Sequence, residues 1–177
     1  MSEAILLQAK PLTQENFAAF GDVIEAGMSE PIMINEGTTE RFHALSEVQL
    51  GSADDKAIIS IFRAQPRSFP MSIQMLERHP HGSQSFHPLS QEPYLVLVAD
   101  AVEKPSAEHL HLFLATAQQG VNYHKGTWHH PLLALNAVSD FLVVDRAGKG
   151  HNCEEITLNQ DIEIPLDYLI QGEGSST

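Results

Sequence analysis

The sequence has one cysteine, few basic residues and no long apolar segment. Its single thiol, at Cys153, cannot form a disulfide within the chain, which is typical of proteins from a reducing compartment. No apolar run approaches the ~18 residues that a membrane-spanning helix requires. The N-terminus also lacks the positive charge and the cleavage site of a secretory signal. These absences predict a cytoplasmic protein with no membrane partner.

Basic residues are scarce, because ten lysines and arginines stand against 23 acidic residues and give a formal net charge of −13. Nucleic-acid-binding proteins need a basic surface for the phosphates, so the composition argues against nucleic acid as a partner. An acidic surface also repels small anions, so an anionic substrate would need a local group of cations. Arg63, Arg67 and Arg78 fall within one stretch and could provide it.

Several catalytic signatures are missing as well. The chain has no Gly-x-Ser-x-Gly elbow, no glycine-rich phosphate loop and no cysteine pair for zinc. Cys153 has no basic neighbour in the sequence that would activate it as a nucleophile. These absences set aside the common serine hydrolases, the P-loop enzymes and cysteine-based catalysis.

The 177 residues are enough for one domain with its own core. Residues 1–177 are therefore expected to form a single domain, with a disordered Gly/Ser tail at 171–177. One short helix is predicted near the N-terminus, where Thr13 is a suitable N-cap and Gly21 can end the helix.

Beyond this helix the signals are short and β-like, separated by clusters of Pro, Gly, Asn and Asp. The candidate strands are 57–63, 71–79, 93–99, 109–114, 132–135, 140–145 and 161–164. Strands do not alternate with helices, which disfavours a parallel α/β sheet. The simplest architecture is mostly β: a single antiparallel β-barrel with a short N-terminal helix.

Two ionisable residues, Glu77 and His79, share one face of the strand predicted at 71–79. Ile73 and Met75 point to the same face. If these apolar residues line a barrel interior, Glu77 and His79 point into its mouth. An ionisable group there is costly unless it is paired, bound to a metal or used in catalysis. The alternative is a buried ion pair that only fixes the strand register.

The spacing around these residues matches two cupin motifs. Segment 77–84 reads Glu-x-His-x4-Gln, the spacing of the first motif, with Glu and Gln as substitutes at its first and third positions. Segment 124–129 reads His-x-Gly-x2-His, the spacing of the second motif, with His where Pro is usual. Cupins bring four such positions together in a small β-barrel, commonly around one divalent metal. The expected metal ligands are Glu77, His79, Gln84 and His129. A neutral glutamine oxygen should hold a cation less firmly than a carboxylate.

Three residues near the motifs each allow two interpretations. Arg63 ends an apolar run at the rim of a strand, so it either holds a substrate carboxylate or forms a rim salt bridge. Trp128 either walls the pocket or lies in the core with its N–H satisfied. His124 either reaches the pocket or stays in a loop.

Six segments together resemble the ureidoglycolate lyase family in order and spacing, from about residue 8 to about residue 165. They are AAFGDVIEAG (18–27), INEGTTERFH (34–43), ISIFRAQP (59–66), ERHPHGSQSFHPL (77–89), GVNYHKGTWHHPL (120–132) and DFLVVDR (140–146). The resemblance implies a cupin-type β-barrel that forms homodimers and is associated with a divalent metal, with nickel the ion to expect. It also implies a lyase that splits (S)-ureidoglycolate into glyoxylate and urea in allantoin (purine nitrogen) degradation.

That reaction needs one general base, one general acid and a group that holds the substrate carboxylate. The resemblance implies base and acid roles for His79, His129 and Glu77, in an order left open, with His124 as a spare acid. Arg63 is expected to hold the carboxylate by a two-pronged contact. Further substrate contacts are expected from Gln84 and Trp128.

Two other functions fit the same residues. One is a non-catalytic cupin that binds a small carboxylic acid without turning it over. The other is a different small-molecule cupin enzyme, such as an iron dioxygenase or a sugar epimerase. The neutral Gln84 argues against the strong iron site of a dioxygenase, and the scarcity of cations argues against the diphosphate pocket of an epimerase.

Overall fold

The computed structural model describes residues 3–169, and within them the fold is mostly β with one short α-helix, as the sequence predicts. The tail expected to be disordered at 171–177 lies outside the described residues. The strands form five sheets, and in the described chain their hydrogen bonds do not close into a barrel. The closed cupin barrel is therefore not established.

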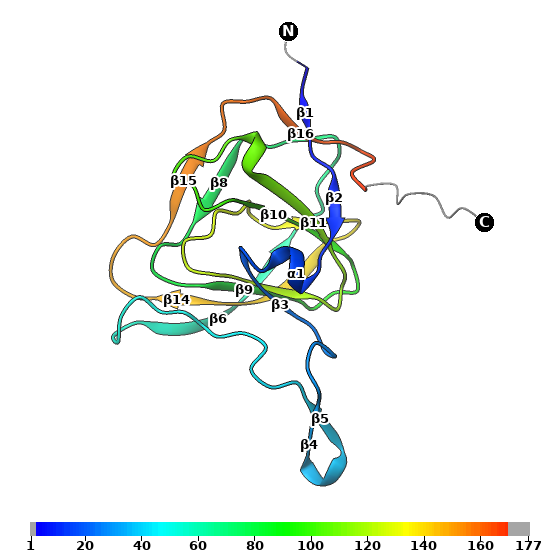
Figure 1. Ribbon diagram of the computed structural model, residues 1–177, viewed down its shortest axis with the longest axis vertical. Helices are drawn as coiled ribbons and strands as arrows, with labels where there is room; N and C mark the ends of the chain where they lie inside the picture. The colour runs from blue at the N-terminus through cyan, green and yellow to red at the C-terminus, as the bar shows by residue number, and fades with distance from the viewer. Residues whose placement is uncertain (1–2, 170–177) are drawn as a thin grey trace, which may run out of the picture.

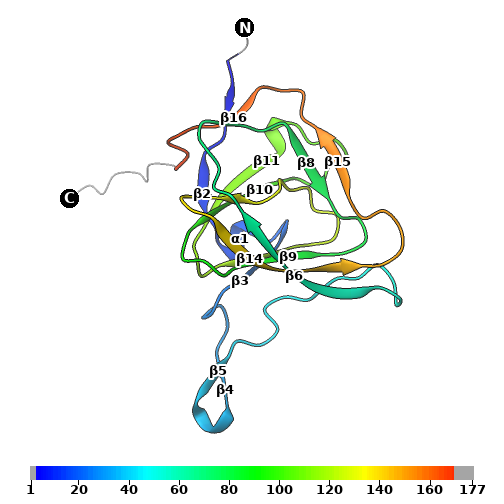
Figure 2. The ribbon, with the colours of Figure 1, turned by 180° about the vertical axis from the view of Figure 1, so that it is seen from behind.

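Two larger sheets make up the body of the molecule (Figures 1 and 2). The first has the strand order β13 (Leu133–Ala134), β10 (Tyr94–Ala99), β11 (Leu110–Ala115) and β2 (Ala9–Pro11). The second has the order β3 (Gly21–Ile24), β12 (Gly120–Tyr123), β9 (Gln84–Pro88), β14 (Ser139–Ala147) and β6 (Lys56–Ala64).

Three smaller sheets complete the described chain. Their strands are β1 (Ile5–Leu6) with β16 (Ile162–Ile164) and β7 (Met71–Ser72), β15 (Glu154–Thr157) with β8 (Met75–Arg78), and β4 (Ile32–Ile34) with β5 (Thr39–Arg41). The β4–β5 hairpin is an arm that projects away from the body (Figure 1). The β1–β16 and β2–β11 pairs are parallel, and the other pairs are antiparallel.

The helix, α1 (Gln14–Phe17), begins where the sequence predicts and ends earlier. The Thr13 hydroxyl accepts a hydrogen bond from the Asn16 amide, and the Asn16 side chain accepts one from the Thr13 amide, which confirms Thr13 as the N-cap. The prediction that Gly21 ends the helix is wrong, because Gly21 begins β3. A Cβ atom at Gly21 would overlap the carbonyl oxygen of Asn122, so the close approach of β3 to β12 requires a glycine.

The strand predicted at 71–79 is two strands, because the chain changes partner within it. Strand β7 pairs with β16, whereas β8 pairs with β15. The short strands β1 to β5 were not predicted, and neither were β9, β12 and β15, whose apolar pattern is interrupted by polar residues.

The core consists of two apolar clusters that lie on opposite faces of β10. Leu95 and Leu97 belong to one cluster, and Val96 and Val98 belong to the other. All six residues of β10 are buried, as expected of a strand that is covered on both faces. Within residues 3–169 no helix is long and apolar enough to cross a membrane.

Candidate active site

The backbone of His129 joins two strands and fixes its side chain beside Glu77. It forms isolated bridges to Glu77 on β8 and to Val98 on β10. The amides of Glu77 and His129 each donate to the other residue's carbonyl, at 2.8 and 2.9 Å. Because directly opposed residues in an antiparallel pair project to the same face, the two side chains meet. His129 Nε2 lies 3.5 Å from Glu77 Oε1.

His79, directly after β8, and Gln84, at the start of β9, approach the same carboxylate. The period of two along the strand places His79 on the face of Glu77, and its Nε2 lies 4.0 Å from Glu77 Oε1. The same Nε2 lies 3.1 Å from Gln84 Oε1. The structure therefore brings together all four residues that the cupin spacing singled out: Glu77, His79, Gln84 and His129.

Both imidazoles present an unprotonated nitrogen to this group when they are neutral. His79 Nδ1 lies 2.7 Å from the Asn152 carbonyl oxygen, and His129 Nδ1 lies 2.9 Å from that of Thr127. A carbonyl oxygen can only accept, so each Nδ1 carries the hydrogen and each Nε2 keeps a lone pair. His129 is 1% exposed, and its Nε2 has no hydrogen-bond partner among the described residues.

Four acceptor atoms therefore converge without a donor between them. They are Nε2 of His79, Nε2 of His129, Oε1 of Glu77 and Oε1 of Gln84. Such an arrangement requires positive charge, either as protons on the imidazoles or as a bound cation. Ligands about 2.1 Å from an ion lie roughly 3–4 Å apart, and ligand atoms of Glu77, His79 and His129 all lie within 4.8 Å of one another. The residues thus fit a divalent metal.

Glu77 is held in its charged form from both sides. The close polar contact with His129 lowers the pKa of Glu77 more than burial raises it, and the charges of His79 and His130 add to the effect. On the other side, the thiol of Cys153 lies 3.9 Å from Glu77 Oε2. Burial and the carboxylates of Glu77 and Glu155 raise the pKa of Cys153, so it remains a thiol that can donate to Oε2.

A second group of ligand atoms lies on the Cys153 side of the same carboxylate. Glu77, Cys153 and Glu155 also offer atoms within 4.8 Å of one another. Glu155 stands opposite Glu77 in the β8–β15 register but is exposed to solvent. This second group lacks a buried lone pair without a partner, which His129 Nε2 provides in the first group, so the first group is the stronger candidate.

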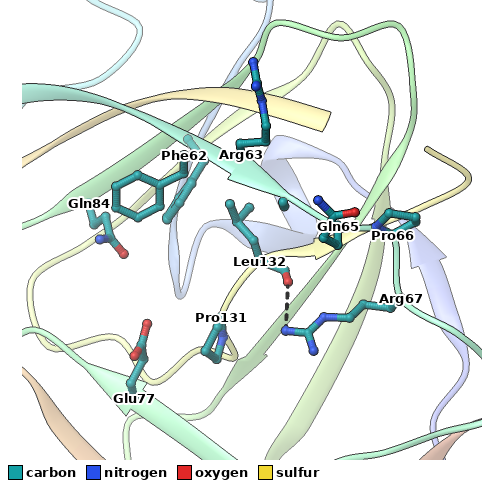
Figure 3. Close-up of a pocket in the computed structure, with 11 residues that line it drawn as sticks. Phe62, Arg63, Gln65, Pro66, Arg67, Glu77, Gln84, Pro131 and Leu132 are labelled. Atoms are coloured by element: carbon teal, nitrogen blue, oxygen red, sulfur yellow. Dashed lines mark hydrogen bonds between the residues drawn. The ribbon is translucent and has the colours of Figure 1, made fainter. Parts of the chain in front are cut away.

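Glu77 and Gln84 open onto a pocket of about 530 Å³, a size suited to a small ligand. Figure 3 shows both polar ends pointing into the same space, beside Phe62 from β6. Arg67 lies on the other side of the pocket, and Pro131 and Leu132 lie between it and Glu77 in the view of Figure 3. One end of the pocket therefore carries the acceptor group and the other carries a guanidinium.

Arg63 lines the pocket but is directed away from it (Figure 3). Its guanidinium donates to both carboxylate oxygens of Asp140, at 2.8 and 2.9 Å, and this salt bridge lowers the pKa of Asp140. The two residues stand opposite each other in the β6–β14 pair, and the Arg63 side chain is 69% exposed. The structure thus places Arg63 in a rim salt bridge, one of its two sequence-based interpretations.

Two other arginines are engaged elsewhere. Arg78 contacts Glu154 at 2.6 Å and stacks over the ring of Trp128 at 4.4 Å. Arg146 contacts Asp55 at 2.7 Å, a hydrogen bond that lowers the pKa of Asp55 to about 2. These contacts leave neither guanidinium available to the pocket.

Arg67 is the arginine of the pocket without a carboxylate partner among residues 3–169. Its Nη2 is 3.5 Å from the Leu132 carbonyl oxygen, a weak contact (Figure 3). Its backbone amide donates to the Ala134 carbonyl at 2.9 Å, which fixes the start of the side chain. The guanidinium is therefore free to bind an anion.

His124 and Trp128 lie outside the group around Glu77. His124 Nε2 contacts Asp22 Oδ2 at 2.9 Å, on the edge of the sheet formed by β3 and β12. Trp128 is 2% exposed and belongs to an apolar cluster, and its indole N–H donates to the Val102 carbonyl at 2.9 Å. For Trp128 the structure thus supports the core interpretation rather than a pocket wall.

Asp145 was missed by reasoning from the sequence. It lies on β14, and its Oδ2 accepts a hydrogen bond from Gln84 Nε2 at 3.3 Å. A signal was present, because Phe141 and Val143 alternate with outward residues and Asp145 continues their inward face. Cys153 was set aside for lack of a basic neighbour, yet its thiol contacts Glu77.

Comparisons with known proteins agree with one family. A family model described as ureidoglycolate lyase matches residues 4–165. Proteins named ureidoglycolate lyase match the chain in Pseudomonas savastanoi pv. phaseolicola (56% identity, covering 82% of this chain and 86% of the relative) and in Pseudomonas syringae pv. tomato (50%, covering 91% and 95%). The relative of the same name in Stutzerimonas stutzeri is 49% identical, with coverage of 91% and 95%.

The family model matches almost the whole described chain, and the relatives are about half identical to it over most of their length. A match of this extent places a chain within the family. The pocket with its group of Glu77, His79, Gln84 and His129 lies inside the matched region. The chain is an enzyme and belongs to the ureidoglycolate lyase family.

Proposed function

We propose that the chain splits (S)-ureidoglycolate into glyoxylate and urea. The observation that carries the proposal is the convergence of a carboxylate, two imidazoles and an amide oxygen at a pocket, in a chain of this family. In the reaction the hydroxyl proton of the substrate leaves its oxygen, a C=O bond forms and the C–N bond breaks. The released nitrogen then takes up one proton, so a single proton moves from oxygen to nitrogen.

Glu77, His79 and His129 are proposed to move that proton. Glu77 lines the pocket, so its carboxylate can meet the substrate hydroxyl directly. In the site without an ion, His129 Nε2 lies behind it at 3.5 Å and can hold the proton until the nitrogen leaves; with an ion bound, the Nε2 lone pairs of both imidazoles would be engaged and the proton would be left to Glu77. His79 Nε2, at 4.0 Å from the same oxygen, is the second candidate.

A divalent metal, nickel by family resemblance, is proposed to be held by Glu77, His79, Gln84 and His129. When bound, such an ion makes a coordinated hydroxyl more acidic and stabilises the negative charge that develops on its oxygen. The residues support this proposal because each imidazole fixes its Nδ1–H on a backbone carbonyl, the outer contact usual for histidine ligands.

The substrate is expected to lie with its carboxylate toward Arg67. Arg63 was the choice from the sequence, but Asp140 occupies both prongs of its guanidinium. Arg67 has the same planar fork, lies in the pocket and lacks a carboxylate partner in the described chain. Gln84, at the opposite end, is proposed to contact the reacting part of the substrate.

Replacing Arg67 with Ala should therefore raise KM roughly ten-fold or more, since a charge-assisted contact is lost. The kcat should fall less, and Arg67→Lys should recover only part of the affinity, because a point charge does not reproduce the fork. The measurement is the KM and kcat of Arg67→Ala and of Arg63→Ala, each compared with the wild type. A raised KM for Arg63→Ala alone would return the role to Arg63.

The finer features of the fold are also proposals. A cupin-type barrel is supported by the cupin spacing and by the inward-facing group of ligand residues. A single domain over residues 1–177 is supported by one family match that spans residues 4–165. The cytoplasmic location stays a prediction from the sequence.

A homodimer is proposed, with β6 and the β4–β5 arm as its contact surface. β6 is an edge strand of the second large sheet, and it exposes Ile59 at 71% and Ile61 at 56%. On the arm, Ile32 and Met33 are 49% and 53% exposed. Exposed apolar side chains on an edge strand are a liability that a second copy can cover. The molar mass in solution should be that of a dimer, and Ile59→Lys should lower it to that of a monomer.

The direct test of function is the release of both products. Purified protein incubated with (S)-ureidoglycolate should give glyoxylate and urea in equal amounts, and without ammonia. Exhaustive chelation should reduce the rate, and nickel should restore it. Binding of the substrate without release of urea would support the non-catalytic alternative instead.

A further inference from the structure

Asp145 is a carboxylate behind the site that the proposed mechanism does not use. It lies on β14 beyond the Val144–Ser85 pair, where the β9–β14 register places Gln84 opposite. Its Oδ2 accepts the hydrogen bond from Gln84, whereas its Oδ1 is buried and has no hydrogen-bond partner among residues 3–169. A buried polar oxygen without a partner costs stability, and such a cost points to a functional reason.

The orientation of the Gln84 amide is the property that Asp145 controls. A primary amide has nearly the same shape when its oxygen and nitrogen exchange places, so packing alone does not choose between the two orientations. An ionised carboxylate can only accept hydrogen bonds, so Asp145 selects the orientation in which Nε2 faces it. Oε1 then faces His79 Nε2 at 3.1 Å and joins the converging acceptors.

We propose that Asp145 is a positioning residue that keeps the oxygen of Gln84, and not its NH2 group, turned toward the site. With the amide reversed, two N–H donors would face the space that a cation needs, and the fourth acceptor would be lost. The part of this inference that concerns turnover rests on the proposed function. The part that concerns cation binding does not.

The contact also changes what Gln84→Glu should do. That substitution gives negative charge to the oxygen that already faces His79, but it also replaces the NH2 donor with a carboxylate oxygen against Asp145, at a contact that is now 3.3 Å long. Combining it with Asp145→Asn removes the conflict, because the amide introduced at position 145 can donate to the carboxylate introduced at position 84. The pair then has its donor and acceptor exchanged, keeps its total charge and still presents an oxygen to His79.

Four full-length proteins test the proposal: wild type, Q84E, D145N and the double variant Q84E/D145N. The affinity for Ni²⁺ is measured by calorimetry, and kcat/KM is measured for ureidoglycolate cleavage. D145N should lower both by roughly 10–100-fold, the range for changes in residues that orient ligands. The double variant should bind Ni²⁺ at least about ten-fold more tightly than either single variant, and its kcat/KM should recover as well.

Two outcomes would overturn the proposal: wild-type nickel affinity and kcat/KM in D145N, or a double variant no better than D145N. If the wild type does not release urea, the proposed function is wrong. The role of Asp145 is then tested by the nickel affinities of the four proteins alone. If the wild type is active but binds no nickel, the role of Asp145 is tested by the order of kcat/KM among the four proteins.

All the substitutions are nearly isosteric, so the fold should be retained, and melting curves check this. Asp161→Asn is the matched control, because Asp161 is exposed and lies away from the pocket. It makes the same chemical change and alters the net charge equally. A loss in this control as large as the loss in D145N would show that net charge, and not the contact with Gln84, sets the affinity.

Discussion

Replacing His129 with Gln is expected to lower kcat roughly 10²–10⁴-fold, the loss typical of a removed acid–base group. His129 Nε2 is buried, has no hydrogen-bond partner among the described residues and lies closer to Glu77 Oε1 (3.5 Å) than the second candidate, His79 Nε2 (4.0 Å). Glutamine retains a polar side chain of similar length, but it cannot take up a proton at neutral pH. The measurement is kcat for urea release, with a melting curve for each protein.

His129→Ala is a poorer test of chemistry because the ring also supports the fold. It stacks on Tyr123 with centroids 4.3 Å apart and planes 11° apart, and it is 1% exposed. Truncation to Ala would leave a cavity and lower Tm as well. His124→Gln is the useful comparison, since the structure pairs His124 with Asp22. A large loss in His124→Gln together with an active His129→Gln would move the acid role to His124.

The sequence predicted the members of the central group because their positions depend on short-range rules. The period of two along β8 places Glu77 and His79 on one face whatever the rest of the fold. The cupin spacing then added Gln84 and His129 by resemblance. Their meeting depends on the bridge between His129 and Glu77, and such long-range pairing cannot be read from a strand pattern.

The partners of individual charged side chains were harder to predict. Arg63 looked suited to a substrate because few cations were available, but the β6–β14 register placed Asp140 opposite it. Arg67, four residues later, became the pocket arginine because the chain leaves β6 at Ala64 and runs beside β13. A sequence gives neither the register of two distant strands nor the path of the loop between them.

The helix and the edges of strands illustrate the same limit. Thr13 was identified because a cap depends on residues three apart, whereas the role of Gly21 depends on the distant carbonyl of Asn122. Asp145 was overlooked although its strand was predicted, because its importance comes from Gln84, 61 residues away. Local chemistry was therefore readable, and cross-strand chemistry was not.

Glu77→Gln is expected to weaken Ni²⁺ binding by at least roughly a hundred-fold, more than the loss of an orienting contact. Glu77 supplies the only formal negative charge of the four proposed ligands, and glutamine keeps its shape while removing that charge. The pKa of Glu77 is lowered by the contact with His129, so the wild-type residue is ionised at neutral pH and the substitution removes a full charge. The kcat should fall by a factor of about 10²–10⁴ if Glu77 also accepts the hydroxyl proton.

Glu155→Gln is the matched control for this loss, and it also decides between the two groups that share Glu77. It makes the same change on the neighbouring strand, directly opposite Glu77, at an exposed position. If the ion lies between Glu77 and the imidazoles, Glu155→Gln should bind Ni²⁺ nearly as wild type does, whereas His129→Gln should not. If the ion instead lies with Cys153 and Glu155, that order reverses, and blocking the single thiol with iodoacetamide should abolish binding too. Nickel titrations of Glu77→Gln, Glu155→Gln and His129→Gln therefore locate the cation, because Glu77 belongs to both groups while the other two residues each belong to one.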